Sequence, residues 1–145
     1  MTDRQSREFA ASHDGLAEAL AFVEAFCESA TVAGDDGLRL TLVVEELFTN
    51  TVEHGHGSAG TGPVSIVRLQ LTAEPTRLVL HYEDEAPHFD PWQGLEQSAP
   101  VLEAPAHERP VGGLGLHLMA GLAVERGYER HDNRNRLWLV LPRRA

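Results

Sequence analysis

The apolar residues of segment 40–57 recur with the period of an α-helix. Four of them form one stripe that should face a core: Leu40, Val44, Leu47 and Phe48. Glu46 and Asn50 follow each other one helical turn apart on the polar side of the same helix. The pattern therefore predicts a half-buried helix that carries a carboxylate next to a carboxamide.

Two other segments have apolar residues at helical spacing. An earlier helix is expected over about 16–30, with Asp14 as its N-cap and an apolar stripe made of Leu16, Leu20, Val23, Cys27 and Ala30. The Gly-Asp-Asp-Gly segment at 34–37 should end this helix and cap the next one. A third helix is expected over about 111–121, where glycines lead into the evenly spaced Leu114, Leu118 and Leu122.

Alternating apolar and polar residues predict the strands. A short edge strand is expected at 6–11, a hairpin from 63–72 and 77–84, and a final strand pair from 124–131 and 136–141 around Asp132 and Asn133. The resulting order predicts an α/β fold, a two-layer α+β sandwich. In it a mostly antiparallel mixed sheet is covered on one face by about three helices. We expect residues 1–145 to form a single domain.

Residues 85–110 break this regularity. Prolines and glutamates recur through the segment, and neither a helical nor a strand period is present. A segment of this length without periodicity is either a functional lid or disordered. We expect a lid at about 92–111.

Composition limits the classes of partner. The formal net charge of −10 argues against general binding to nucleic-acid phosphates and favours basic protein partners. No apolar run approaches the length of a membrane span, and the single cysteine suits a reducing compartment. The expected location is the cytoplasm, without membrane or direct nucleic-acid binding.

Several polar residues in this order suit nucleotide chemistry. The Glu46 carboxylate can accept a proton, the Asn50 amide oxygen is a hard ligand for Mg²⁺, and Asp84 can accept a hydrogen bond from an exocyclic amine. A helix entered through glycines can bring backbone N–H groups close to phosphate; these glycines are Gly112, Gly113 and Gly115. Taken singly, each pattern also fits a solvated helix face or a flexible helix entry.

Four motifs in this order resemble a known family. They are E-x-x-x-N-x-x-x-H-G at 46–55, D-x-G-x-x-F-D-P at 84–91 with Ala86 in place of the glycine, G-G-x-G-L-x-L at 112–118, and R-N-x-L-x-L at 134–139. The chain resembles the ATP-binding domains shared by gyrase-type ATPases, histidine kinases and MutL, in the small branch of anti-sigma serine kinases. The resemblance covers nearly the whole chain.

The resemblance implies ATP and Mg²⁺ as cofactors and a role for particular residues. Glu46 would act as the catalytic base or orient the attacking group, Asn50 would be the Mg²⁺ ligand, and Asp84 would accept a hydrogen bond from the adenine amine. The remaining cofactor-binding positions would be Ala86, Arg109, Gly112, Gly113, Gly115 and Leu116, with Arg109 either on the terminal phosphate or a solvated lid residue. If the family's glycine is needed for a close backbone approach to adenine, the methyl group of Ala86 would weaken ATP binding; if φ at position 86 is negative, alanine costs nothing.

The resemblance also implies an activity. The chain would be an ATP-dependent protein serine/threonine kinase that acts as an anti-sigma factor, phosphorylates a STAS-type anti-anti-sigma partner and engages a sigma factor or another regulator. It would form a homodimer. The alternative is an ATP-binding module that sequesters its partner without kinase activity. A histidine kinase domain is less consistent with the motifs at 84–91 and 112–118.

Overall fold

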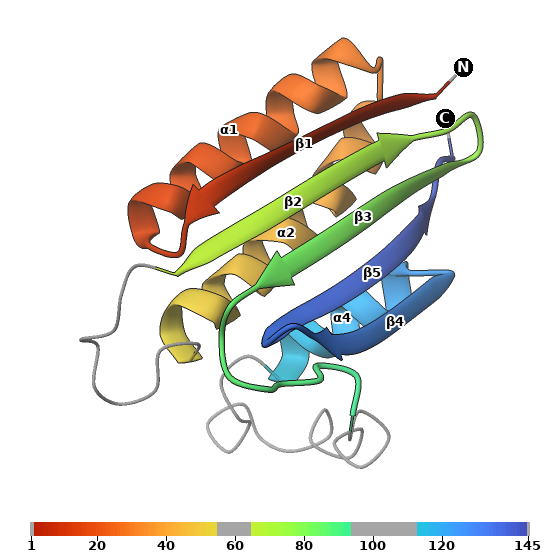
Figure 1. Ribbon diagram of the computed structural model, residues 1–145. Coiled ribbons are helices and arrows are strands. Elements are labelled where there is room, and N and C mark those ends of the chain that lie inside the picture. Colours follow the sequence, from red (N-terminus) through yellow and green to blue (C-terminus); the bar gives the residue numbers. More distant parts are fainter. Residues whose placement is uncertain (1, 55–64, 94–112, 145) are drawn as a thin grey trace.

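A single antiparallel sheet forms one layer of the protein (Figure 1). The computed structural model describes residues 2–54, 65–93 and 113–144. Within them the strand order is β1-β2-β3-β5-β4. The strands are β1 Asp3–Ala10, β2 Ile66–Ala73, β3 Arg77–Asp84, β4 Glu125–His131 and β5 Arg134–Pro142. The predicted order of elements and both predicted hairpins are confirmed, and all four pairings are antiparallel.

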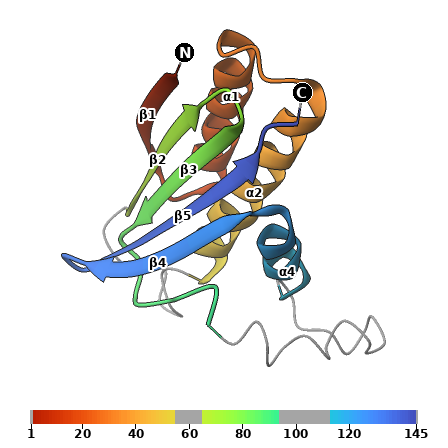
Figure 2. The same ribbon diagram turned by 90° about the vertical axis from the view of Figure 1, so that its right-hand side faces the viewer.

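Among the described residues, three helices form the second layer and lie on one face of the sheet (Figure 2). They are α1 His13–Ser29, α2 Gly34–His54 and α4 Gly113–Leu122. The two-layer α/β sandwich predicted from the sequence is therefore the observed fold. Within the described ranges no helix is long and apolar enough to span a membrane.

The core lies between the helices and the inner face of the sheet. The predicted stripe of α2 is buried as expected, and so are alternate residues of the three central strands. The central-strand residues are Val67, Leu69, Leu71, Ala73, Leu78, Leu80, Tyr82, Leu137, Leu139 and Leu141. This alternation fixes which side chains at the strand ends point toward the helices.

The predicted first helix is correct in place but wrong in its cap and its buried stripe. Its N-cap is Ser12, not Asp14, because the Ser12 hydroxyl accepts a hydrogen bond from the Gly15 N–H at 3.0 Å. The buried residues are Gly15, Ala19, Phe22, Val23 and Phe26. Leu16, Leu20 and Cys27 are only partly buried. The helix is thus rotated about its axis relative to the predicted orientation. Aromatic packing accounts for this difference, since the Phe22 ring lies 5.6 Å from that of Phe9.

Two further helix predictions also need correction. The Gly-Asp-Asp-Gly segment does not end α1 but forms the first turn of α2, where Asp35 and Asp36 suit the positive end of the helix dipole. In α4 the predicted leucine stripe is wrong at Leu118, which is 62% exposed, while Met119 is buried. The α4 pattern was misleading because nearly every position in this short helix is apolar or glycine.

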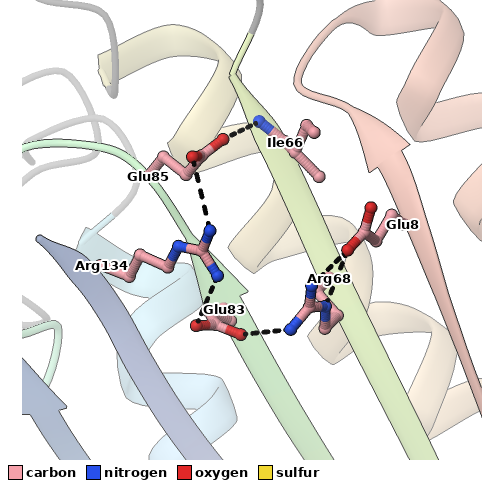
Figure 3. Close-up of a pocket in the computed structure, with 6 residues that line it drawn as sticks. All are labelled: Glu8, Ile66, Arg68, Glu83, Glu85 and Arg134. Carbon is pink, nitrogen blue, oxygen red and sulfur yellow. Dashed lines mark hydrogen bonds and ion pairs between the residues drawn. The ribbon is translucent and has the colours of Figure 1, made fainter. Parts of the chain in front are cut away.

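The outer face of the sheet carries a row of alternating charges, one from each strand. We call it the charge ladder: Glu8, Arg68, Glu83, Arg136 and Glu129. Arg68 bridges Glu8 and Glu83, with 3.4 Å to Glu83, and Arg136 lies 3.1 Å from Glu83 and 3.6 Å from Glu129. Figure 3 shows Arg134 beside this row, between Glu83 and Glu85. No helix covers this face among the described elements (Figure 2).

Candidate functional site

Three element ends carry the predicted site residues to one end of the molecule. The C-terminal half of α2, the C-terminal end of β3 and the N-terminal end of α4 lie together in Figure 1. Two contacts fix this arrangement. The Thr51 hydroxyl of α2 donates to Asp84 Oδ2 of β3 at 2.8 Å, and Gly115 of α4 lies against the Glu46 carboxylate.

Glu46 is half-buried on α2, one turn before Asn50. Burial, followed by the nearby carboxylates Glu45 and Glu53, raises the pKa of the Glu46 carboxyl above its ordinary value. A carboxylate with a raised pKa is a better proton acceptor than one in free solution. The environment of Glu46 therefore suits a general base.

Gly115 allows α4 to approach Glu46 closely. A Cβ atom at Gly115 would lie 2.1 Å from both Cδ and Oε1 of Glu46, so any larger residue would displace that carboxylate. The N-terminal end of a helix favours an anion, because its first N–H groups lack partners within the helix. Glu46 and an anion-binding helix end are thus neighbours.

Asn50 is half-buried on the same helix, one turn after Glu46. Among the described residues its carboxamide has no hydrogen-bond partner. An amide oxygen is a suitable ligand for a hard cation such as Mg²⁺. The residue thus fits the role that the sequence implied.

Asp84 is buried at the end of β3 and is held by three donors from described residues. Oδ2 accepts from the Thr51 hydroxyl at 2.8 Å. Oδ1 accepts from Asn135 Nδ2 at 2.9 Å and from the Ala86 N–H at 3.2 Å. An ionised carboxylate has about four acceptor positions, so one is left for a ligand donor such as an exocyclic amine.

Ala86 takes the place of the family's glycine without backbone strain. Among described non-glycine residues, φ is positive only at Thr31, Asp132 and Asn133, so Ala86 lies outside the left-handed region. Ala86 is buried, and its carbonyl accepts from Arg130 Nη1 at 2.7 Å and from Asn135 Nδ2 at 3.3 Å. The backbone at position 86 therefore accepts alanine without strain, and the effect of its methyl group on the approach of adenine stays a prediction.

Asn135 is a residue whose role sequence reasoning missed. Its Nδ2 also donates to the Pro87 carbonyl at 2.9 Å, and its Oδ1 accepts from the Phe89 N–H at 3.2 Å and the Tyr128 hydroxyl at 2.6 Å. Asn135 is only 2% exposed. A signal was present, because the alternation of β5 places this polar residue on the same face as Leu137 and Leu139.

Thr51 and Tyr82 were also missed. Both are buried, and their hydroxyls lie 2.5 Å apart next to Asp84. The strand period does place the Tyr82 side chain inward. No local pattern indicates that Thr51 reaches it.

The remaining predicted positions are only partly described. Arg109 and Gly112, with the lid predicted at 92–111 beyond residue 93, lie outside the described residues. Gly113 begins α4, as expected for a glycine at a helix entry. Leu116 packs partly buried against the core, so its side chain has a structural role.

The residues that are described fit a nucleotide with its metal. They supply an acceptor for an amine at Asp84, an amide oxygen at Asn50 and a helix N-terminal end at Gly113 and Gly115. No cluster of metal-binding side chains occurs in the described ranges. An amide oxygen such as that of Asn50, together with phosphate oxygens of a bound nucleotide, would suit Mg²⁺.

Comparison with known proteins identifies the family. The model of the histidine kinase-like ATPase domain matches residues 9–141. No curated protein matches the chain. Two solved nucleotide-free forms of the catalytic domain of histidine kinase ThkA are similar, each with 15% identity over 96% of this chain. The alignments cover 97% and 98% of those chains, with TM-scores of 0.48 and 0.49. Since the family model spans β1 to β5, the chain belongs to the histidine kinase-like ATPase domain family.

Proposed function

We propose that this protein is an ATP-dependent protein serine/threonine kinase of the anti-sigma type. Its substrate would be a serine of a STAS-type anti-anti-sigma partner, and its output would be the release or sequestration of a sigma factor or another regulator. One observation carries the proposal. The half-buried Glu46 lies against the N-terminal end of α4, one helical turn before the carboxamide of Asn50.

Each residue would have a separate task in the transfer. Asp84 would accept a hydrogen bond from the adenine amine, and Asn50 would hold Mg²⁺ through its amide oxygen. The N-terminal end of α4 would hold phosphate oxygens. Glu46 would orient the serine hydroxyl and take its proton. The serine oxygen would form the new bond to the terminal phosphorus while the bond from that phosphorus to the β,γ-bridging oxygen breaks and ADP leaves. Positioning and electrostatics provide most of the rate enhancement in such transfers.

The surface charge suits a protein partner. With a net charge of −10, the chain should associate fastest with a partner that presents basic residues. A homodimer and a STAS-type partner are parts of the proposal that size-exclusion chromatography with both proteins tests directly.

The central experiment separates nucleotide binding from transfer. The purified chain is incubated with radiolabelled ATP, Mg²⁺ and a STAS-domain protein. Glu46→Gln should retain ATP affinity and lose at least about 100-fold in transfer rate, since it removes the proton acceptor. Equal transfer by both proteins would overturn the role of Glu46. ATP binding without transfer by the wild type would support the alternative, a sequestration module without kinase activity.

A matched pair of glycines in α4 tests the position of Glu46. Gly115→Ala should slow transfer about tenfold or more with little loss of stability, because the new methyl group displaces the flexible end of Glu46. Gly121→Ala is the control, since a Cβ there meets no atom within 4 Å. Equal rates for the two variants would contradict the assigned geometry.

Binding measurements test the nucleotide pocket itself. Asp84→Asn should lose most ATP affinity, and Asn50→Ala should lose the part of the affinity that depends on Mg²⁺. Calorimetry with and without Mg²⁺ separates the two effects. Unchanged affinity in both variants would refute the proposed ATP site.

A further inference from the structure

Thr51 links the helix that carries Glu46 and Asn50 to the strand that carries Asp84. It follows Asn50 directly in α2 and is 5% exposed. Its hydroxyl lies 2.8 Å from Asp84 Oδ2, 2.5 Å from the Tyr82 hydroxyl and 3.2 Å from the Leu47 carbonyl. A side chain of the helix layer thus contacts the carboxylate at the end of β3.

The donors and acceptors in this cluster can be assigned. An ionised Asp84 only accepts, so the Thr51 hydroxyl must donate its single proton to Asp84. The Tyr82 hydroxyl then donates either to Thr51 Oγ1 or to the Leu47 carbonyl at 3.2 Å. Burial, and then the charge of Asp84, raises the pKa of Tyr82 well above its ordinary value, so Tyr82 stays a donor. Of these two acceptors Thr51 Oγ1 is the nearer, at 2.5 Å against 3.2 Å, so the hydrogen bonds run from Tyr82 through Thr51 to Asp84.

Thr51 differs from the other donors to Asp84 in where it comes from. Asn135 and the Ala86 N–H belong to the sheet and to the segment just after Asp84. Within the described part of the chain, Thr51 is the donor that comes from the helix layer. The hydrogen bond from Thr51 orients Oδ2 of Asp84. Oδ2 accepts from one described donor and Oδ1 from two, so Oδ2 is the oxygen with room for the amine of a ligand.

We propose that Thr51 is a positioning residue for base recognition: its hydroxyl holds Asp84 so that the carboxylate accepts the 6-amino group of a purine. The inference rests on the proposed ATP site and deepens it. A hydrogen bond from the Tyr82 hydroxyl to Thr51 Oγ1 strengthens the hydrogen bond that Thr51 donates to Asp84, and so holds the carboxylate more firmly in place. Loss of the Thr51 hydroxyl should therefore weaken the binding of nucleotides that carry the 6-amino group, and should leave the binding of nucleotides without it unchanged.

The test compares two nucleotides that differ only at that amine. Calorimetry with Mg²⁺ measures the affinity of the full chain for ATP and for purine riboside triphosphate, which lacks the 6-amino group. The wild type should prefer ATP by about tenfold or more, the value of one hydrogen bond to a charged group. Thr51→Val should lose most of this preference, and Thr51→Ser, which restores the hydroxyl, should regain it.

A control on the same helix separates this effect from a general loss of stability. The Thr41 hydroxyl donates to the Gly37 carbonyl at 2.9 Å. Thr41→Val should therefore keep the preference for ATP. If Thr51→Val does not fold, Tyr82→Phe removes the donor next to Thr51 and should reduce the preference by a smaller factor.

The contrary outcomes are distinct. A Thr51→Val chain with the wild-type preference would overturn the inference and leave the ATP site intact. Equal weakening of both nucleotides would also overturn it, since that indicates a structural role only. A wild-type chain that does not bind ATP would refute the proposed function first, and the inference with it.

Discussion

The end of β3 presents carboxylates to two opposite faces of the sheet. On the inner face, Asp84 is buried and is held by neutral donors from Thr51, Asn135 and the Ala86 N–H. On the outer face, Glu83 contacts Arg68, Arg134 and Arg136, all of them about half exposed. One strand segment therefore carries two kinds of polar cluster, because its side chains alternate between the faces.

The two polar clusters differ in their exposure to water. In the buried cluster each lost partner leaves an unsatisfied group in a medium of low dielectric, which costs far more than a lost bond in water. In the charge ladder, water and salt screen each ion pair, so single pairs stabilise little. The inner face thus defines a site of fixed geometry, whereas the outer face contributes a modest and salt-dependent stability.

The largest effect should follow from breaking the inner cluster. Asn135→Ala leaves Asp84, two backbone carbonyls and the Phe89 N–H without their shared partner, and should lower the free energy of unfolding by about 3 kcal/mol. Urea denaturation followed by circular dichroism measures the change. Gln70→Ala, an amide on the outer face, is the control and should cost less than about 1 kcal/mol. Equal losses would contradict the distinction between the two faces.

A second effect concerns Glu46, a carboxylate of the helix layer. None of the hydrogen-bond donors that hold Asp84 donates to it. Because its pKa is raised, transfer should fall about tenfold per pH unit below that pKa. The folded chain binds this proton more tightly than the unfolded chain does. Stability should therefore decrease as pH rises from the ordinary glutamate pKa through the raised value.

The variant Glu46→Gln tests the predicted pH dependence of both the transfer rate and the stability. It should remove the transfer activity and also the loss of stability across that pH window, as measured by urea unfolding at several pH values. If the variant loses stability over the window to the same extent as the wild type, the raised pKa of Glu46 is wrong.

A smaller effect is expected at the centre of the charge ladder. Glu83→Gln weakens the contacts with Arg68, Arg134 and Arg136, and should lower stability by about 1 kcal/mol at low salt and less at 1 M salt. Glu24→Gln, at an exposed position of α1 on the opposite side of the sheet, is the control. A loss that does not diminish with salt would mean that Glu83 acts through burial instead of charge.

The smallest effect should appear at the edge of the ladder. Glu8 on β1 pairs with Arg68, and both side chains are about half exposed. Glu8→Gln should change stability by about 0.5 kcal/mol or less, which thermal denaturation can resolve in a parallel series with Glu83→Gln. A loss at Glu8 that exceeds the loss at Glu83 would reverse the expected order.

The local patterns of the sequence determined the order of elements, the hairpins, the buried stripe of α2 and the residues Glu46, Asn50 and Asp84. Periodicity and turn chemistry act over a few residues, so they can be read without the fold. They were ambiguous where most positions are apolar, as in α1 and α4, and there the choice of buried residues depended on the partner surface.

Only the tertiary structure decided what Asp84 and Glu46 contact. The donors Thr51 and Asn135 lie 33 and 51 residues from Asp84 in the chain. The closeness of Gly115 to Glu46 likewise depends on how α4 packs against α2. Such contacts follow from burial of the core as a whole, which brings together polar groups that must then satisfy one another. The sequence by itself thus predicted the polar residues of the candidate site, and the packing of the two layers determined their partners and geometry.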